Sequence, residues 1–146
     1  RRKIMEELLV YAILFYEDII TEEQYQKELD KLFLKNPSDE MLLYLEWETD
    51  IKKAIIFIRT HINYQDLSHD IVGTVLMEQL RIYYYQCQNI QKFANKMYSL
   101  WESLPGDMQN KQPFEVFCYI DDPLSWGEEK EVRFLYEQIL NYYKKS

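Results

Sequence analysis

The side chains best suited to metal or acid–base chemistry are two histidines and one pair of glutamates. His61 and His69 are eight positions apart, whereas two ligands on one helical face need a separation of three or four. Glu128 and Glu131 form one ExxE segment, but helical magnesium enzymes need a second such segment, and the sequence has none. The sequence therefore predicts no metal and no cofactor, and it favours a protein that is not an enzyme.

The cysteines and glycines also lack the spacing of known chemical motifs. Cys87 and Cys118 form no CxxC pair and have no neighbouring histidine, so we expect free thiols and a cytoplasmic location. The three glycines, at positions 73, 106 and 127, cannot form the GxGxxG or GxxxxGK loops that cradle phosphates. These motifs for nucleotide binding are therefore absent.

Charge and hydropathy argue against nucleic-acid and membrane partners. The chain has 17 Lys and Arg against 25 Asp and Glu, a net charge of −8, and its basic residues are scattered. Nucleic-acid binding needs a basic face that replaces counterions around phosphate. The longest apolar run, residues 8–16, is far shorter than the roughly 20 residues of a membrane span.

The negative charge is concentrated in residues 17–50, which hold eleven Asp or Glu against three Lys. Such a face can steer a basic partner protein to fast association. The alternative interpretation is an ordinary solvated helix surface. We assign partner binding in this segment to Glu46, Glu48 and Asp50.

A second candidate surface combines aromatic and acidic side chains in residues 119–129. Trp and Tyr beside carboxylates in a loop are typical of interface hot spots, and the alternative is that Trp126 packs inward. The three consecutive tyrosines at 83–85 span about 200° of a helix and cannot all face one core. The residues assigned to a partner surface in these two segments are Tyr83, Tyr84, Asp121, Asp122, Trp126 and Glu129.

Helices are the elements expected to position these residues, because apolar residues recur at three and four positions and no segment alternates as a strand does. The first helix is expected over residues 4–16. Thr21 and Gln24 have the pattern of a capping box that starts a second helix, and Pro37 ends it. The buried residues expected in this second helix are Tyr25, Leu29, Leu32 and Phe33.

Further helix starts are indicated by candidate capping residues. Ser38 is expected to cap a third helix, and Thr49 or Asp50 a fourth. Residues 68–104 are helical in pattern but would span about 55 Å as one helix. We therefore expect a break or kink, with two helices meeting near Gln88 and Asn89 as one solution.

The last helix is expected after the stop at residues 105–107, beyond an irregular stretch. Ser125 and Glu128 repeat the capping-box pattern and would start it. The apolar residues that define this helix are Val132, Phe134, Leu135, Ile139, Leu140 and Tyr143. Together these patterns predict one all-α domain over residues 1–146, a compact bundle of about five to seven helices without significant sheet.

The leading hypothesis for function is a non-enzymatic, acidic module that binds a basic partner protein. In physical character the chain is similar to the colicin-type immunity proteins, which are small, helical and acidic with adjacent tyrosines near carboxylates. That similarity implies an immunity or antitoxin protein that neutralises a basic toxin. Two alternatives are an enzyme or small-ligand protein with a pocket between helices, and an adaptor that forms a homo-oligomer.

Overall fold

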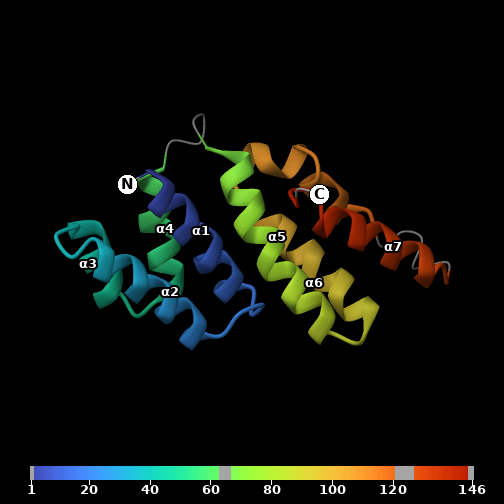
Figure 1. Ribbon diagram of the computed structural model, residues 1–146, viewed down its shortest axis with the longest axis horizontal. Helices are drawn as coiled ribbons and strands as arrows, with labels where there is room; N and C mark the ends of the chain where they lie inside the picture. The colour runs from blue at the N-terminus through green and yellow to red at the C-terminus, as the bar shows by residue number, and fades with distance from the viewer. Residues whose placement is uncertain (1, 63–66, 121–126, 145–146) are drawn as a thin grey trace. The chain divides into compact units, whose positions relative to one another are not determined.

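The computed structural model describes residues 2–62, 67–120 and 127–144, which contain seven α-helices, two short 3-10 helices and no strand (Figure 1). The prediction of an all-α bundle of about five to seven helices is confirmed. The chain divides into two compact units, residues 1–72 and residues 73–146, and the boundary falls within helix α5. That the whole chain behaves as one domain stays a prediction.

Unit 1 is built from four helices and the first turn of a fifth. Helix α1 contacts both α2 and α4, and α2 contacts α3. The side chains from these helices that are fully buried include Leu8, Leu9, Leu29, Leu42, Leu45 and Ile58. The bounds of the helices are α1 (Arg2–Tyr16), α2 (Glu22–Lys35), α3 (Glu40–Trp47) and α4 (Ile51–Thr60).

The turn between α1 and α2 combines a left-handed residue with a capping box. Asp18 has a φ of 62°, a conformation that Asp tolerates better than most residues. Thr21 Oγ1 accepts a hydrogen bond from the Gln24 amide at 3.1 Å, and Gln24 Oε1 accepts one from the Thr21 amide at 2.8 Å. The predicted capping box is thus confirmed, and it fixes where α2 begins.

Neighbouring acidic side chains cap the next two helices. Asp39 caps α3 by accepting hydrogen bonds from the amides of Met41 and Leu42, so the predicted cap at Ser38 is wrong by one residue. A carboxylate with two oxygens competes well for these amides. Asp50 caps α4 by accepting from the Lys52 amide at 2.9 Å, which confirms one of the two predicted caps.

The buried face of α2 is narrower than predicted. Tyr25 and Leu29 are buried, whereas Leu32 and Phe33 are only half-buried. The helix ends at Lys35, with Asn36 as its C-cap, just before Pro37 as predicted. Only the first half of α2 therefore contributes fully to the core.

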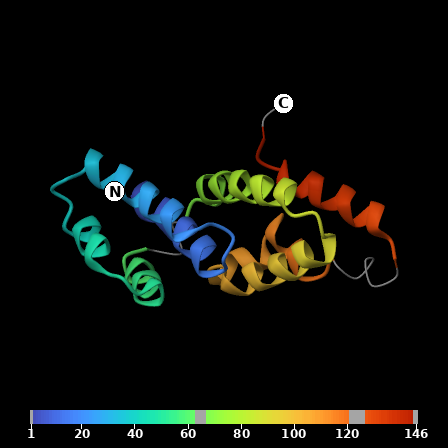
Figure 2. The same ribbon diagram turned by 90° about the horizontal axis from the view of Figure 1, so that it is seen from below.

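Unit 2 consists of most of α5 (His69–Gln86), then α6 (Ile90–Ser103), two 3-10 helices and α7 (Glu129–Leu140), as Figure 2 shows. Asn89 caps α6 by accepting from the Lys92 amide at 3.1 Å, so the expected break near Gln88 and Asn89 is confirmed. The 3-10 helices η2 (Gly106–Asn110) and η3 (Phe114–Cys118) form the predicted irregular stretch.

Helix α7 (Glu129–Leu140) begins later than predicted. Its N-cap is Glu128, which makes no side-chain capping bond, so the expected start beside Ser125 is wrong. Ser125 itself lies outside the described residues. The helix buries Tyr136 beside Val132 and Ile139, while Phe134, expected among its core residues, is 60% exposed.

Among the residues that the structure describes, no helix has both the length and the apolar character needed to cross a membrane.

Candidate partner-binding site

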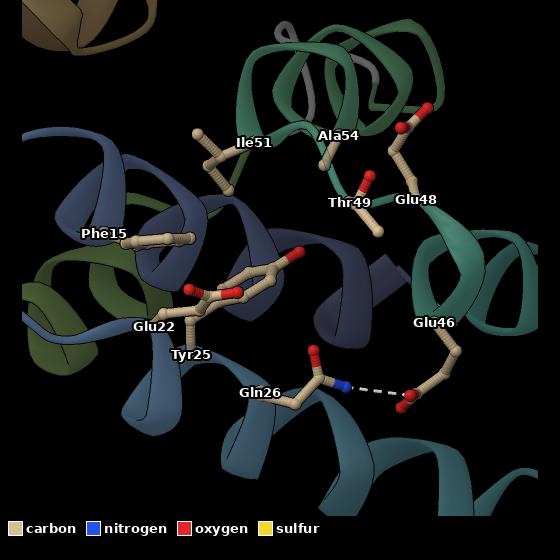
Figure 3. A pocket seen from close by; sticks show the side chains of 9 residues that line it. All are labelled: Phe15, Glu22, Tyr25, Gln26, Glu46, Glu48, Thr49, Ile51 and Ala54. Atoms are coloured by element: carbon tan, nitrogen blue, oxygen red, sulfur yellow. Dashed lines mark hydrogen bonds between the residues drawn. The ribbon is translucent and has the colours of Figure 1, made fainter.

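Unit 1 contains a small cleft of about 70 Å³ between the end of α1, the first two turns of α2 and the junction of α3 with α4 (Figure 3). We call it the acidic cleft, because three of its lining side chains are glutamates. The lining residues are Phe15, Glu22, Tyr25, Gln26, Glu46, Glu48, Thr49, Ile51 and Ala54.

The local sequence explains how these side chains come together. Because the capping box starts α2 at Glu22, residues 22, 25 and 26 are spaced at three and four positions and share one helix face. Helix α3 ends at Trp47, so Glu46 and Glu48 sit at its C-terminal end. The contact between α2 and α3 then brings the two sets of side chains to one cleft.

Glu46 is held against a second carboxylate on α2. The Gln26 Nε2 donates hydrogen bonds to Glu46 Oε2 and to Asp30 Oδ1, both at 2.9 Å. Burial is the main cause that raises the pKa of Glu46 to about 7, and the hydrogen bond and charge of Asp30 add to it. The hydrogen bond from the Gln26 amide acts in the opposite direction. Near neutral pH the carboxyl group of Glu46 is therefore protonated for part of the time.

Tyr25 points a buried hydroxyl group into the acidic cleft. Its side chain is 5% exposed, and its hydroxyl has no hydrogen-bond partner among the described residues. In Figure 3 the hydroxyl lies near the middle of the group of lining side chains. Burial and the nearby charge of Glu46 raise the pKa of Tyr25 to about 12, so this hydroxyl stays neutral and can donate or accept a hydrogen bond.

Glu48, the C-cap of α3, is held in place by two hydrogen bonds. Its Oε1 accepts from the Tyr44 hydroxyl at 3.0 Å, and its Oε2 accepts from the Asp50 amide at 3.2 Å. The Tyr44 ring in turn stacks on Phe57 of α4 with centroids 4.1 Å apart. These two hydrogen bonds fix the carboxylate of Glu48, which in Figure 3 points away from Tyr25.

Trp47 is an exposed aromatic residue beside the acidic cleft that the sequence analysis missed. It lies between Glu46 and Glu48 in sequence and is 79% exposed. Leu43, one turn earlier on α3, is also exposed. The signal that could have identified Trp47 is the one applied to Trp126, an aromatic residue flanked by carboxylates.

The structure groups two of the predicted site residues and places a third next to them. Glu46 and Glu48 both line the acidic cleft, and Asp50 is exposed at the start of α4, where its carboxylate caps the helix. These three residues belong to unit 1. The others that are described lie in unit 2.

The three consecutive tyrosines of α5 differ in exposure. Tyr84 is only 6% exposed and donates a hydrogen bond to Glu137 Oε2 at 2.9 Å, so its side chain faces the interior of unit 2. Tyr83 is half-buried and stacks on Phe93. The expectation that at least one of the three tyrosines is exposed is confirmed by Tyr85, which is 73% exposed.

The remaining predicted residues are near the start of α7. Glu129 is exposed in the first turn, and its Oε1 accepts from Arg133 at 3.3 Å. Asp121, Asp122 and Trp126 lie outside the described residues.

The candidates for metal or thiol chemistry are dispersed. Within residues 2–62, 67–120 and 127–144, no group of three or more His, Cys, Asp or Glu side chains could hold a metal ion. His61 caps the end of α4 and packs on Phe57, and His69 is the first residue of α5. Cys87 and Cys118 are free thiols, each half-buried.

Comparisons of the chain with models of protein families, with curated proteins and with solved structures found no match.

Proposed function

We propose that the protein is a non-enzymatic binding module that uses the surface around the acidic cleft to dock onto a basic site of a partner protein. The observation that carries this proposal is the acidic cleft itself, which is lined by three glutamates and by Tyr25, whose buried hydroxyl lacks a partner among the described residues. A basic group from another protein would neutralise the charge of the glutamates and could donate a hydrogen bond to the tyrosine hydroxyl.

The position of the glutamates supports this proposal. Glu46 and Glu48 lie at the C-terminal end of α3, where the helix dipole disfavours anions, and the last turn of α3 has no basic residue. Residues that break a local stability rule in this way are found most often at functional sites. A bound cation would relieve the repulsion.

The size of the acidic cleft favours a protein partner over a small-molecule substrate. Pockets for small molecules are typically about 300–1,000 Å³, whereas the acidic cleft has a volume of about 70 Å³. That volume suits the end of one side chain. Trp47 next to it adds the kind of exposed aromatic residue that anchors protein interfaces.

A more specific form of the proposal is that the partner is a basic toxin, such as a nuclease, and that the protein is its immunity protein or antitoxin. The support is the physical character of the chain, which is small, helical and acidic. A neighbouring gene that encodes a secreted protein with a basic C-terminal domain would strengthen this form. A neighbourhood without any such gene would weaken it.

The proposal is tested by capturing partners with the full chain and with a variant in which Glu22, Glu46 and Glu48 are all replaced by Gln. The bound proteins are quantified by mass spectrometry at about 50 mM and about 500 mM salt. We expect a basic protein that the unmodified chain captures at low salt, that the triple variant loses, and that high salt releases.

A matched control removes the same charge elsewhere. The control variant replaces three exposed glutamates of unit 2 by Gln, namely Glu78, Glu102 and Glu128. It changes the net charge by the same amount and should still capture the partner. The proposal is wrong if no basic protein is captured at low salt, or if both triple variants lose it to the same degree.

A further inference from the structure

We infer that the acidic cleft is a receptor for the guanidinium group of one arginine side chain of the partner protein. This inference rests on the proposed function and specifies the chemical group that the partner inserts. It follows from the size, the charge and the hydrogen-bonding groups of the acidic cleft.

The lining of the acidic cleft selects a cation. Three of its residues are glutamates, and none of the described residues that line it is Lys or Arg. A cation of the partner would thus meet no basic side chain in the lining. It would lie close to Glu46, whose ionised form is disfavoured by the negative charge of Asp30.

The aromatic and hydroxyl groups favour arginine over lysine. The rings of Phe15 and Tyr25 lie together, with centroids 5.5 Å apart, and a planar guanidinium can stack on such rings. The guanidinium also has five N–H donors in a fixed fork, which can reach a carboxylate and the Tyr25 hydroxyl together. An ammonium group has three donors and no flat face.

Binding of the cation should release a proton. The titratable groups that face Glu46 are Asp30 and Tyr25 from α2 and Glu22 at the rim, with Glu48 on its own side of the cleft. When the guanidinium enters, the proton on Glu46 leaves to solvent, and the resulting carboxylate pairs with the cation. Affinity should therefore be lower at pH 6 than at pH 8.

The test is a titration of the isotope-labelled full chain with N-acetylarginine methylamide, followed by the NMR signals of the backbone amides. We expect saturable shifts that cluster at residues 22–26 and 46–51. The citrulline analogue has nearly the same shape without charge and should produce no such shifts. The lysine analogue should bind more weakly than the arginine analogue.

Two conservative variants separate the contributions. Tyr25→Phe removes only the hydroxyl, and Glu46→Gln removes only the charge, so each should weaken arginine binding by about tenfold, the value of one charge-assisted hydrogen bond. Glu40→Gln, an exposed residue of α3 outside the cleft, removes the same charge and should leave the affinity unchanged. Thermal unfolding of each variant checks that it folds.

The outcome that overturns the inference is an absence of saturable shifts at the acidic cleft, or equal binding of the arginine and citrulline analogues. Binding that survives both Tyr25→Phe and Glu46→Gln would also overturn it. These failures are distinct from failure of the proposed function. If the cleft does not take arginine but the triple glutamate variant still loses a basic protein, the proposed function stands without this inference.

Discussion

The pKa of Glu46 is strongly raised, because its carboxyl group is partly buried and lies next to Asp30. Its pKa of about 7 in the folded chain exceeds the ordinary value of 4.5. The folded state therefore binds the proton more tightly than the unfolded state. This contribution to stability is fully present below about pH 4.5 and is lost as the pH rises through about 7.

Replacement of Glu46 by Gln should make the protein more stable at pH 8 than the unmodified chain, by about 1 kcal/mol after allowance for solvent screening. Well below pH 4.5, at about pH 3, the two proteins should be equally stable, because Glu46 is then neutral in both the folded and the unfolded state. Chemical denaturation across this pH range measures the difference. In an Asp30→Asn background the stability gained by Glu46→Gln should be smaller, since the charge of Asp30 is one cause of the raised pKa. A stability difference that does not vary with pH would contradict the raised pKa of Glu46.

Tyr25 illustrates how binding and stability can oppose each other at one residue. Its hydroxyl is buried without a hydrogen-bond partner among the described residues. Tyr25→Phe keeps the ring packing against Phe15 and should raise the free energy of unfolding by about 1 kcal/mol, because an unsatisfied buried polar group is removed. Denaturant unfolding measures this effect, and a loss of stability of that size would show that the hydroxyl contributes to the fold.

At the scale of the elements, the packing of α5 requires glycine at position 73, although helix propensity alone would favour alanine there. The Cβ of any other residue at position 73 would overlap the ring of Tyr143, which packs against the helix there. We therefore expect Gly73→Ala to destabilise the protein by about 1–3 kcal/mol, as overpacking does. Thermal or chemical denaturation measures the change.

The sign of this effect should reverse when the ring is removed. In a Tyr143→Ala background, Gly73→Ala no longer meets an obstacle and should stabilise α5 by up to about 1 kcal/mol, the difference in helix propensity. If Gly73→Ala has the same effect in both backgrounds, the close approach of Tyr143 is not the reason for this glycine.

Helix boundaries could be predicted where only one residue in the vicinity could act as the N-cap. Thr21 with Gln24 starts α2 as expected, and Asn89 starts α6 at the expected break. Ser38 failed because the adjacent Asp39 is a competing cap with a carboxylate. The expected helix start beside Ser125 failed because Gly127 has a φ of 83°, which is outside the α-helical region, so the helix begins only after Glu128.

The acidic cleft could be predicted only in part. Charge density alone identified Glu46 and Glu48, and helical periodicity identified Tyr25 as buried. The role of the Tyr25 hydroxyl could not be foreseen, because it depends on the contact between α2 and α3, whose facing residues are about 20 positions apart. The burial of Tyr84 could not be foreseen for a related reason, since its contacts include Phe93 of α6 and Glu137 of α7, which are distant in sequence.

At the scale of the whole molecule, the two units differ in charge. Residues 1–72 hold 15 acidic and 9 basic residues, whereas residues 73–146 hold 10 and 8. Repulsion among like charges destabilises the folded state, and salt screens it. Unit 1 should therefore respond to salt more strongly than unit 2.

We expect added salt, from about 20 mM to about 200 mM, to increase protection from hydrogen exchange in α2 and α3 more than in α6 and α7. Hydrogen-exchange mass spectrometry resolves the two units. The variant with Gln at positions 22, 46 and 48 should lose most of this difference. Equal gains in both units would show that the charge of residues 17–50 does not limit the stability of unit 1.

The exposure of Trp47 gives the protein an intrinsic optical probe. Its indole is exposed, and the residues on either side of it in sequence line the acidic cleft, whereas Trp101 is partly buried and donates through Nε1 to the Gln109 carbonyl at 2.9 Å. A partner protein that covers Trp47 as it docks would dehydrate the ring and shift its fluorescence emission to shorter wavelength. Association could then be followed in real time with unlabelled protein, and Trp47→Phe would show which indole reports it.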